Sequence, residues 1–188
     1  MAIWMAWLRE RVRWTVFAPT IGSLAIAACW VADVWTIAAL AAAGLLTSAL
    51  VLQFRLWDDV EDCERDAAWH PARVMVRSGR RAFVIPLFVL TLATTAIGGV
   101  AGGPRVAALI IALDVAALSA YRLVRPAIPD ALWQYGVLLL KYPAFLIAGA
   151  VALGASEALR FWLAGAAAYA AAVTYEAAHT RAAIEENA

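Results

Sequence analysis

Four aspartates stand close together in the segment DDVEDCERD of an otherwise apolar chain. Read as a helix that turns about 100° per residue, the segment predicts that all four share one face, at about 0°, 40°, 80° and 100°: Asp58, Asp62, Asp66 and Asp59. Like charges at neighbouring helical positions repel each other, so we expect a cation to compensate them. Carboxylate oxygens are ligands that Mg²⁺ prefers, usually one or two of them together with the phosphates of a substrate. The spacing therefore predicts a site for Mg²⁺ and a phosphorylated ligand.

Arginines near the aspartates allow two interpretations. Arg73 and Arg77 follow the segment and could bind the phosphates of a ligand through charge-assisted hydrogen bonds. Alternatively, Arg55 and Arg65 lie within one helical turn of acidic residues, so ion pairs inside a salt-bridged helix could absorb the charge. Asp is a poorer helix former than Glu, and the convergent face is all Asp. This composition favours the metal site over the plain salt-bridged helix.

The rest of the chain is typical of an integral membrane protein. Of its 188 residues 65% are hydrophobic and 15% are charged, and the mean hydropathy is +0.77, well on the apolar side of soluble domains. Stretches long enough to cross about 30 Å of hydrocarbon as helices predict an all-α, polytopic membrane bundle that forms a single domain, residues 1–188. About six spans are expected, roughly 14–32, 34–54, 82–100, 105–124, 131–153 and 159–180, with an acidic cytoplasmic loop at 55–81. The net charge is +1, so no binding to nucleic acid is expected.

Basic residues are distributed unevenly about these spans. With six crossings, all 15 Lys and Arg residues fall on one side except Arg105, Arg160 and Lys141. Short loops rich in Lys and Arg stay in the cytoplasm, so both termini and the acidic loop are predicted to be cytoplasmic, in a membrane of the bacterial inner-membrane type. The Trp-rich stretch at residues 1–14 is expected to form a turn at the membrane surface.

The motif Asp58-Asp59-x-x-Asp62-x-x-x-Asp66 resembles the first aspartate-rich motif of the UbiA superfamily of intramembrane prenyltransferases, written Asn/Asp-Asp-x-x-Asp-x-x-x-Asp. That family carries the motif at the cytoplasmic end of its second transmembrane helix, which is where the second predicted span ends. The resemblance implies that the four aspartates are catalytic residues and metal ligands. The Mg²⁺ that they bind would bridge the diphosphate of a prenyl donor.

Other residues look like those that bind the donor in this family. The stretch His70-Pro71-x-Arg73, with Arg77, looks like the segment that leads into the third helix. Tyr121-Arg122 follows the fourth span, where family members carry Tyr and basic residues near the diphosphate. The resemblance implies that five side chains bind this substrate: Arg73, Arg77, Tyr121, Arg122 and Lys141.

Two further positions carry ionisable groups at membrane depth or near it. Lys141 lies in the fifth span and Asp114 in the fourth, where such a group is costly unless it faces the bundle interior or water. A structural ion pair between them is the alternative to a role for Lys141 at the diphosphate. At the place of the family's second aspartate motif the chain has Glu176, with Tyr175 and His179, and Glu176 is the implied additional metal ligand.

The implied function is Mg²⁺-dependent transfer of a prenyl group from a prenyl diphosphate to an aromatic or lipid-pathway acceptor. The chain length of the donor and the identity of the acceptor stay open. So do two alternatives, a membrane terpene cyclase of the same superfamily and a non-catalytic membrane subunit that binds a diphosphate. Family members have about nine helices against the six predicted here. A partner subunit or homo-oligomer would replace the remaining helices, or the cavity would be smaller.

Overall fold

The computed structural model describes residues 2–128 and 136–185, with the side chains of residues 3–128 and 136–178. The described residues are helical and contain no strand, which confirms the all-α prediction. The part of the predicted fifth span at 131–135 and the side chain of His179 lie outside the described residues. The helices in chain order are α1 (Ala2–Arg11), α2 (Trp14–Ala32), α3 (Ile37–Trp69), α4 (Val74–Ser78), α5 (Arg81–Ser119), η1 (Ala120–Val124), α6 (Arg125–Ala127), α8 (Lys141–Ala152) and α9 (Ala158–Glu185).

Three helical segments of the described chain are long and apolar enough to cross a membrane. They are Trp14–Ala32, Ile37–Trp69 and the continuous run Arg81–Ala127, while Gly136–Ala152 is a shorter apolar helix. A span of this kind must satisfy its own backbone hydrogen bonds, which a helix does. The helices therefore have the length and composition expected of a helical membrane protein.

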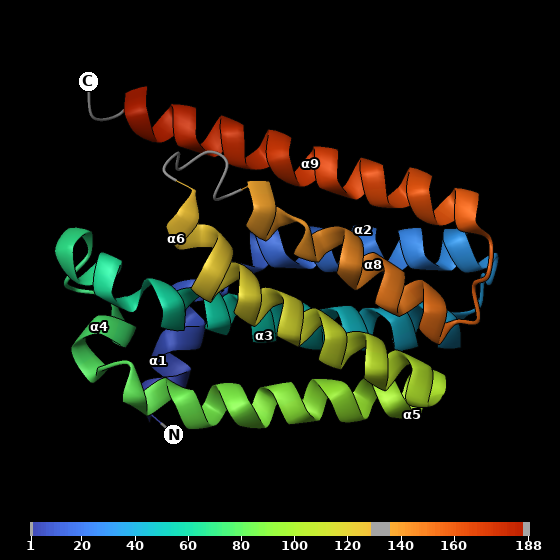
Figure 1. Ribbon diagram of the computed structural model, residues 1–188, viewed down its shortest axis with the longest axis horizontal. Helices are drawn as coiled ribbons and strands as arrows, with labels where there is room; N and C mark the ends of the chain where they lie inside the picture. The colour runs from blue at the N-terminus through green and yellow to red at the C-terminus, as the bar shows by residue number, and fades with distance from the viewer. Residues whose placement is uncertain (1, 129–135, 186–188) are drawn as a thin grey trace.

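Helix α5 is broken near its middle and folds back on itself (Figure 1). Gly102 and Gly103 leave the helical conformation, Gly103 with a φ of 73° that favours glycine, and Pro104 starts the second arm. A Cβ atom built on Gly98 would lie 2.3 Å from Cδ1 of Ile110, so the two arms touch where glycine leaves no side chain. The break falls inside the segment GGVAGGPR, residues 98–105, between the predicted spans 82–100 and 105–124.

Helices α2 and α3 also form a hairpin. Asp33 ends α2 in the left-handed conformation with a φ of 56°, and the side chain of Thr36 caps α3 by accepting a hydrogen bond from the Ala39 amide. This turn lies where the sequence predicts that the chain folds back. Helix α3 then runs without a break to Trp69 and stops before Pro71.

The prediction of a loop at 55–81 is wrong for most of that segment. At 1.5 Å per residue the 33 residues of α3 extend about 50 Å, well beyond about 30 Å of hydrocarbon. The last turns, which carry the aspartates, therefore form a helical extension at one end of the bundle. The short α4 follows, and the chain enters α5 after Gly79 and Arg80.

Two apolar cores hold the helices together. The larger lies between α2, α3, α5 and α8 and includes Leu46, Leu50, Ile110 and Phe145. The smaller lies at the aspartate end, where α1, α3, α4 and the start of α5 meet around a fully buried Trp7. The N-terminal stretch is thus a helix packed on the bundle, whereas a surface turn was predicted. Helix α9 lies along α8 and α2 (Figure 1).

Candidate functional site

A cavity of about 990 Å³ opens between α2, α3, α8 and α9 at the aspartate end of the bundle. Its polar wall carries charged side chains from α1, α3, α8 and α9 and from the residues just before α2 and α4. The charged lining residues are Glu10, Arg11, Arg13, Arg55, Asp58, Asp62, Arg65, Asp66, Arg73, Lys141 and Glu176. Arginine and lysine thus outnumber carboxylates six to five among the described lining residues, which favours an anionic ligand.

The other end of the same cavity is apolar. It is lined by Phe17, Leu24, Val51, Phe54 and Phe145, and by alanines of α9. The rings of Phe54 and Phe145 are 5.1 Å apart and meet edge to face, and both side chains are fully buried. A cavity that is charged at one end and aromatic at the other matches an amphiphile with an anionic head and a hydrocarbon tail.

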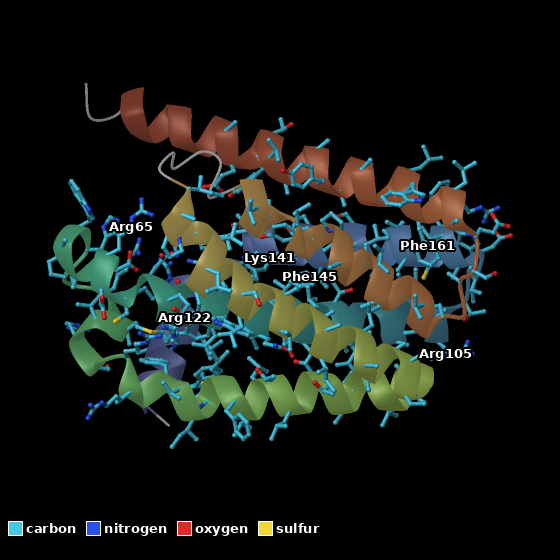
Figure 2. The ribbon with its side chains drawn as sticks, in the orientation of Figure 1. Arg65, Arg105, Arg122, Lys141, Phe145 and Phe161 are labelled. Atoms are coloured by element: carbon cyan, nitrogen blue, oxygen red, sulfur yellow. The ribbon has the colours of Figure 1, made fainter. Side chains whose placement is uncertain are left out.

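Asp58 joins three elements at the inner end of the polar wall. The hydroxyl of Tyr121 donates to its Oδ1 atom, and the Nζ atom of Lys141 lies 2.5 Å from its Oδ2 atom. Lys141 stands at the start of α8, one turn before Phe145 (Figure 2). The predicted alternative, an ion pair between Lys141 and Asp114, is therefore wrong. Asp114 instead accepts a 2.6 Å hydrogen bond from Nε2 of the buried Gln53.

The next two aspartates also pair with arginines. Asp62 accepts a 2.5 Å hydrogen bond from Nη2 of Arg125, and Asp66 forms an ion pair with Arg73. Asp58, Asp62 and Asp66 all line the cavity and are one turn apart on α3, as the helical spacing predicts.

Asp59 has a different environment. Its side chain is only 4% exposed and does not line the cavity. It accepts a hydrogen bond from Trp7 Nε1 at 2.9 Å, and Arg11 donates to both oxygens at 2.9 and 2.6 Å. The prediction that all four aspartates share one face toward the ligand is thus wrong for Asp59, because α1 packs against α3 at this position and its Trp7 and Arg11 bind the carboxylate.

Only some of the predicted substrate-binding residues line the cavity. Arg73 and Lys141 line the cavity, whereas Arg77, Tyr121 and Arg122 do not. Tyr121 is buried behind Asp58, and Arg122 binds Glu61 at 3.1 Å on another face of α3. Arg77 is an exposed residue of α4.

Sequence reasoning missed four cavity arginines, Arg11, Arg13, Arg55 and Arg65, as residues that could contact a ligand. The first two were read only as a marker of the cytoplasmic side. A signal for them was available, because Arg11 and Arg13 immediately precede a spanning helix whose first turn would bring them to the level of the aspartates.

The donor chemistry of the cavity fits Mg²⁺ bound together with a ligand. No three acidic, His or Cys side chains among the described residues converge as a ready metal-binding group. Asp58, Asp62, Asp66 and Glu176 nevertheless face one cavity, and Mg²⁺ needs only one or two carboxylates when phosphate oxygens complete its shell. Asp59 does not fit, because its oxygens are taken by Trp7 and Arg11.

Comparison of the chain with models of protein families, with curated proteins and with solved structures gives no match. The resemblance to the UbiA superfamily is therefore carried by the motif and the residues around it.

Proposed function

We propose that the protein is an Mg²⁺-dependent membrane prenyltransferase of the UbiA type, which transfers a prenyl group from a prenyl diphosphate to an aromatic or lipid-pathway acceptor. The observation that carries the proposal is the cavity itself, in which three aspartates of the motif and six cations lie at one end and the buried Phe54 and Phe145 at the other. This polarity corresponds to the two halves of a prenyl diphosphate.

The proposal includes a topology of six crossings. These are α2, α3, the two arms of α5, the segment that ends with α8, and α9. Both termini and the aspartate end of α3 would lie on the cytoplasmic side. The charges support this orientation, because Arg65 and Arg122 lie at one end of the molecule and Arg105 at the other (Figure 2).

In the proposed mechanism the chain's own residues bind and orient the donor. Asp58, Asp62, Asp66 and Glu176 would hold Mg²⁺, which neutralises diphosphate charge when it is bound. Arg73 and Lys141 bind the phosphate oxygens and stabilise the charge that develops on them as the bond from carbon to oxygen breaks. The bonding electron pair leaves with the diphosphate, and an allylic cation remains at the prenyl carbon.

The apolar end of the cavity then controls the fate of that cation. The aromatic faces of Phe54, Tyr142 and Phe145 exclude water and attract positive charge. An electron pair of the acceptor forms the new bond to the prenyl carbon, and the acceptor loses a proton to restore neutrality. If the prenyl chain's own double bond supplied the electron pair, the result would be the terpene cyclase.

The internal ion pairs of the aspartates are compatible with this mechanism. Each cavity aspartate already has a cation beside it, so a phosphate oxygen can replace Asp58 on Lys141 or Asp66 on Arg73, and the released carboxylate would then be available to hold Mg²⁺. The exchange replaces one set of charge-assisted contacts by another and leaves no buried charge unpaired.

The test uses the purified protein in lipid nanodiscs with Mg²⁺, candidate acceptors and radiolabelled prenyl diphosphates of several chain lengths. We expect release of diphosphate together with a prenylated product. Asp62→Asn should lower the rate by about 100-fold or more, the usual cost of losing one group that stabilises transition-state charge. Asp33→Asn, which changes an exposed carboxylate at the other end of the bundle, is the matched control and should keep the rate. Equal rates in wild type and Asp62→Asn would contradict the proposal.

The second candidate is a membrane subunit that binds a prenyl diphosphate without turning it over. It is favoured by one observation, that every aspartate of the motif pairs with a cation of the chain itself. Stoichiometric binding without product release would identify this function. A cyclised hydrocarbon as the product would identify the cyclase.

A further inference from the structure

We propose that Asp59 is the latch that holds α1 on the bundle, and that through α1 it positions Arg11 and Arg13 in the wall of the cavity as additional contacts for an anionic ligand. Asp59 would thus be a positioning residue and not a metal ligand, although it belongs to the aspartate motif. The ligand part of the proposal rests on the proposed function, whereas the latch itself does not.

The contacts of Asp59 leave no oxygen for a metal. Oδ2 accepts hydrogen bonds from Trp7 Nε1 and Arg11 Nε, both at 2.9 Å. Oδ1 accepts from Arg11 Nη2 at 2.6 Å and lies 3.4 Å from Nη2 of Arg55. Arg11 thus binds the carboxylate through two parallel hydrogen bonds, a geometry that is both strong and specific in direction. Burial alone would lower the pKa of Arg11, but its hydrogen bonds to Asp59 and the charge of that carboxylate outweigh burial and raise the pKa.

One other hydrogen bond of the described residues joins α1 to the rest of the bundle, from the Val74 amide to Glu10 at 2.9 Å. The remaining support is apolar, with the fully buried ring of Trp7 packed against Phe83. Removal of the Asp59 charge would leave the indole N–H of Trp7 with a weaker acceptor and the guanidinium of Arg11 without its counterion. Both are buried or nearly so, and an unpaired buried charge is strongly unfavourable.

The latch has a consequence for the cavity because α1 and α2 are joined by only two residues, Val12 and Arg13. A fixed α1 therefore fixes the guanidinium of Arg11, which lines the cavity, and the start of α2, where Arg13 lines it too. Arg55 links the same carboxylate to the cavity wall from α3. The positions of three arginines that line the cavity, Arg11, Arg13 and Arg55, thus depend on Asp59, which does not line it.

The first experiment measures the latch without any ligand. Limited trypsin digestion of the full protein in nanodiscs, read by mass spectrometry, gives the rate of cleavage after Arg11 and Arg13. We expect Asp59→Asn to raise this rate at least tenfold over wild type, and Asp62→Asn to leave it unchanged. Trp7→Phe removes the indole donor and part of a buried ring but keeps the Arg11 pair, so it should give an intermediate rate. It keeps the test decisive if Asp59→Asn does not fold. Wild-type cleavage rates in both latch variants would overturn the proposal.

The second experiment measures binding of farnesyl diphosphate, with farnesol as the uncharged comparison, over a series of Mg²⁺ concentrations. Asp59→Asn should weaken farnesyl diphosphate binding about tenfold and leave farnesol binding and the Mg²⁺ concentration for half-maximal effect unchanged. Asp62→Asn should instead raise the Mg²⁺ requirement. In turnover, Asp59→Asn should raise KM for the diphosphate and spare kcat.

Arg13→Gln tests whether Asp59 acts through α1 and α2. It should reproduce part of the loss of affinity without faster cleavage after Arg11, the tryptic site that remains in this variant, and the double variant Asp59→Asn/Arg13→Gln should bind no more than twofold weaker than Asp59→Asn alone. A raised Mg²⁺ requirement in Asp59→Asn would overturn the latch and restore Asp59 as a metal ligand. If the wild type binds no farnesyl diphosphate, the proposed function and the ligand role of Arg13 both fail, while the trypsin result still decides the latch.

Discussion

At the scale of single residues, each aspartate of the motif has a different partner. Asp58 binds Tyr121 and Lys141, whereas Asp59 binds α1. Spacing on a helix gives the direction of each side chain, but not which neighbouring helix lies in that direction. The sequence could therefore predict that Asp58 and Asp62 point the same way, and it could not predict that α1 would cover Asp59.

The ion pair of Lys141 with Asp58 offers a prediction at this scale. Lys141 is 12% exposed and Asp58 19%, so Lys141→Met leaves a poorly solvated carboxylate without its cation. We expect the free energy of unfolding to fall by about 3–5 kcal/mol, the range for breaking a buried pair. Unfolding in detergent, followed by circular dichroism, would measure it.

Two comparisons sharpen this prediction. The double variant Lys141→Met/Asp58→Asn removes both charges and should recover most of the loss. Arg160→Met breaks ion pairs to the exposed Asp33 and Glu157 at the other end of the bundle, and should cost less than about 1 kcal/mol. Equal losses in Lys141→Met and Arg160→Met would show that burial does not govern the strength of these pairs.

At the scale of helices, the glycines of GGVAGGPR determine how α5 folds back. A Cβ atom on Gly102 would lie 2.7 Å from the Cα atom of Ala152 in α8, a backbone atom that has little freedom to move. At Gly102 the turn of α5 therefore lies in close contact with the backbone at the end of α8.

The substitution Gly102→Ala tests this contact. We expect a loss of about 1–3 kcal/mol in the free energy of unfolding, because overpacking forces the two backbones apart. Gly22→Ala is the control, since nothing lies within 4 Å of a Cβ atom there, and it should be neutral or slightly stabilising. The same detergent unfolding experiment compares them, and a neutral Gly102→Ala would contradict the close approach of α5 and α8.

Helix boundaries were predicted with mixed success, for physical reasons. The turn at Asp33 and the break near Gly102 carry residues that end helices locally, so the sequence alone indicates them. The helical geometry of the aspartate segment was predicted, although residues 55–69 were assigned to a loop, and the repelling carboxylates on one face disfavour a helix by themselves. Arginines from α1, α4 and α6 and a lysine from α8 offset that repulsion, and these contacts exist only in the folded molecule.

At the scale of the whole molecule, the proposed six crossings place the two ends of the bundle on opposite sides of the membrane. Single cysteines at Ser78 and at Ala155, introduced after replacement of Cys29 and Cys63 by serine, report on the two ends. Under the proposed topology a membrane-impermeant thiol reagent should label position 78 only from the cytoplasmic side and position 155 only from the opposite side. Labelling of both positions from the same side would contradict an arrangement with both termini in the cytoplasm.

Helix α9 is fastened to α2 at the end remote from the aspartates. Arg160 donates to the carbonyl oxygen of Trp30 at 3.2 Å and lies 3.6 Å from Asp33, while Glu176 stands on the cavity wall sixteen residues further along the helix. That separation is about 24 Å along the axis of α9, so a pivot of about 10° at Arg160 would carry Glu176 through about 4 Å. A small angular change at the Arg160 contact would therefore produce a much larger displacement of the α9 wall of the cavity at Glu176.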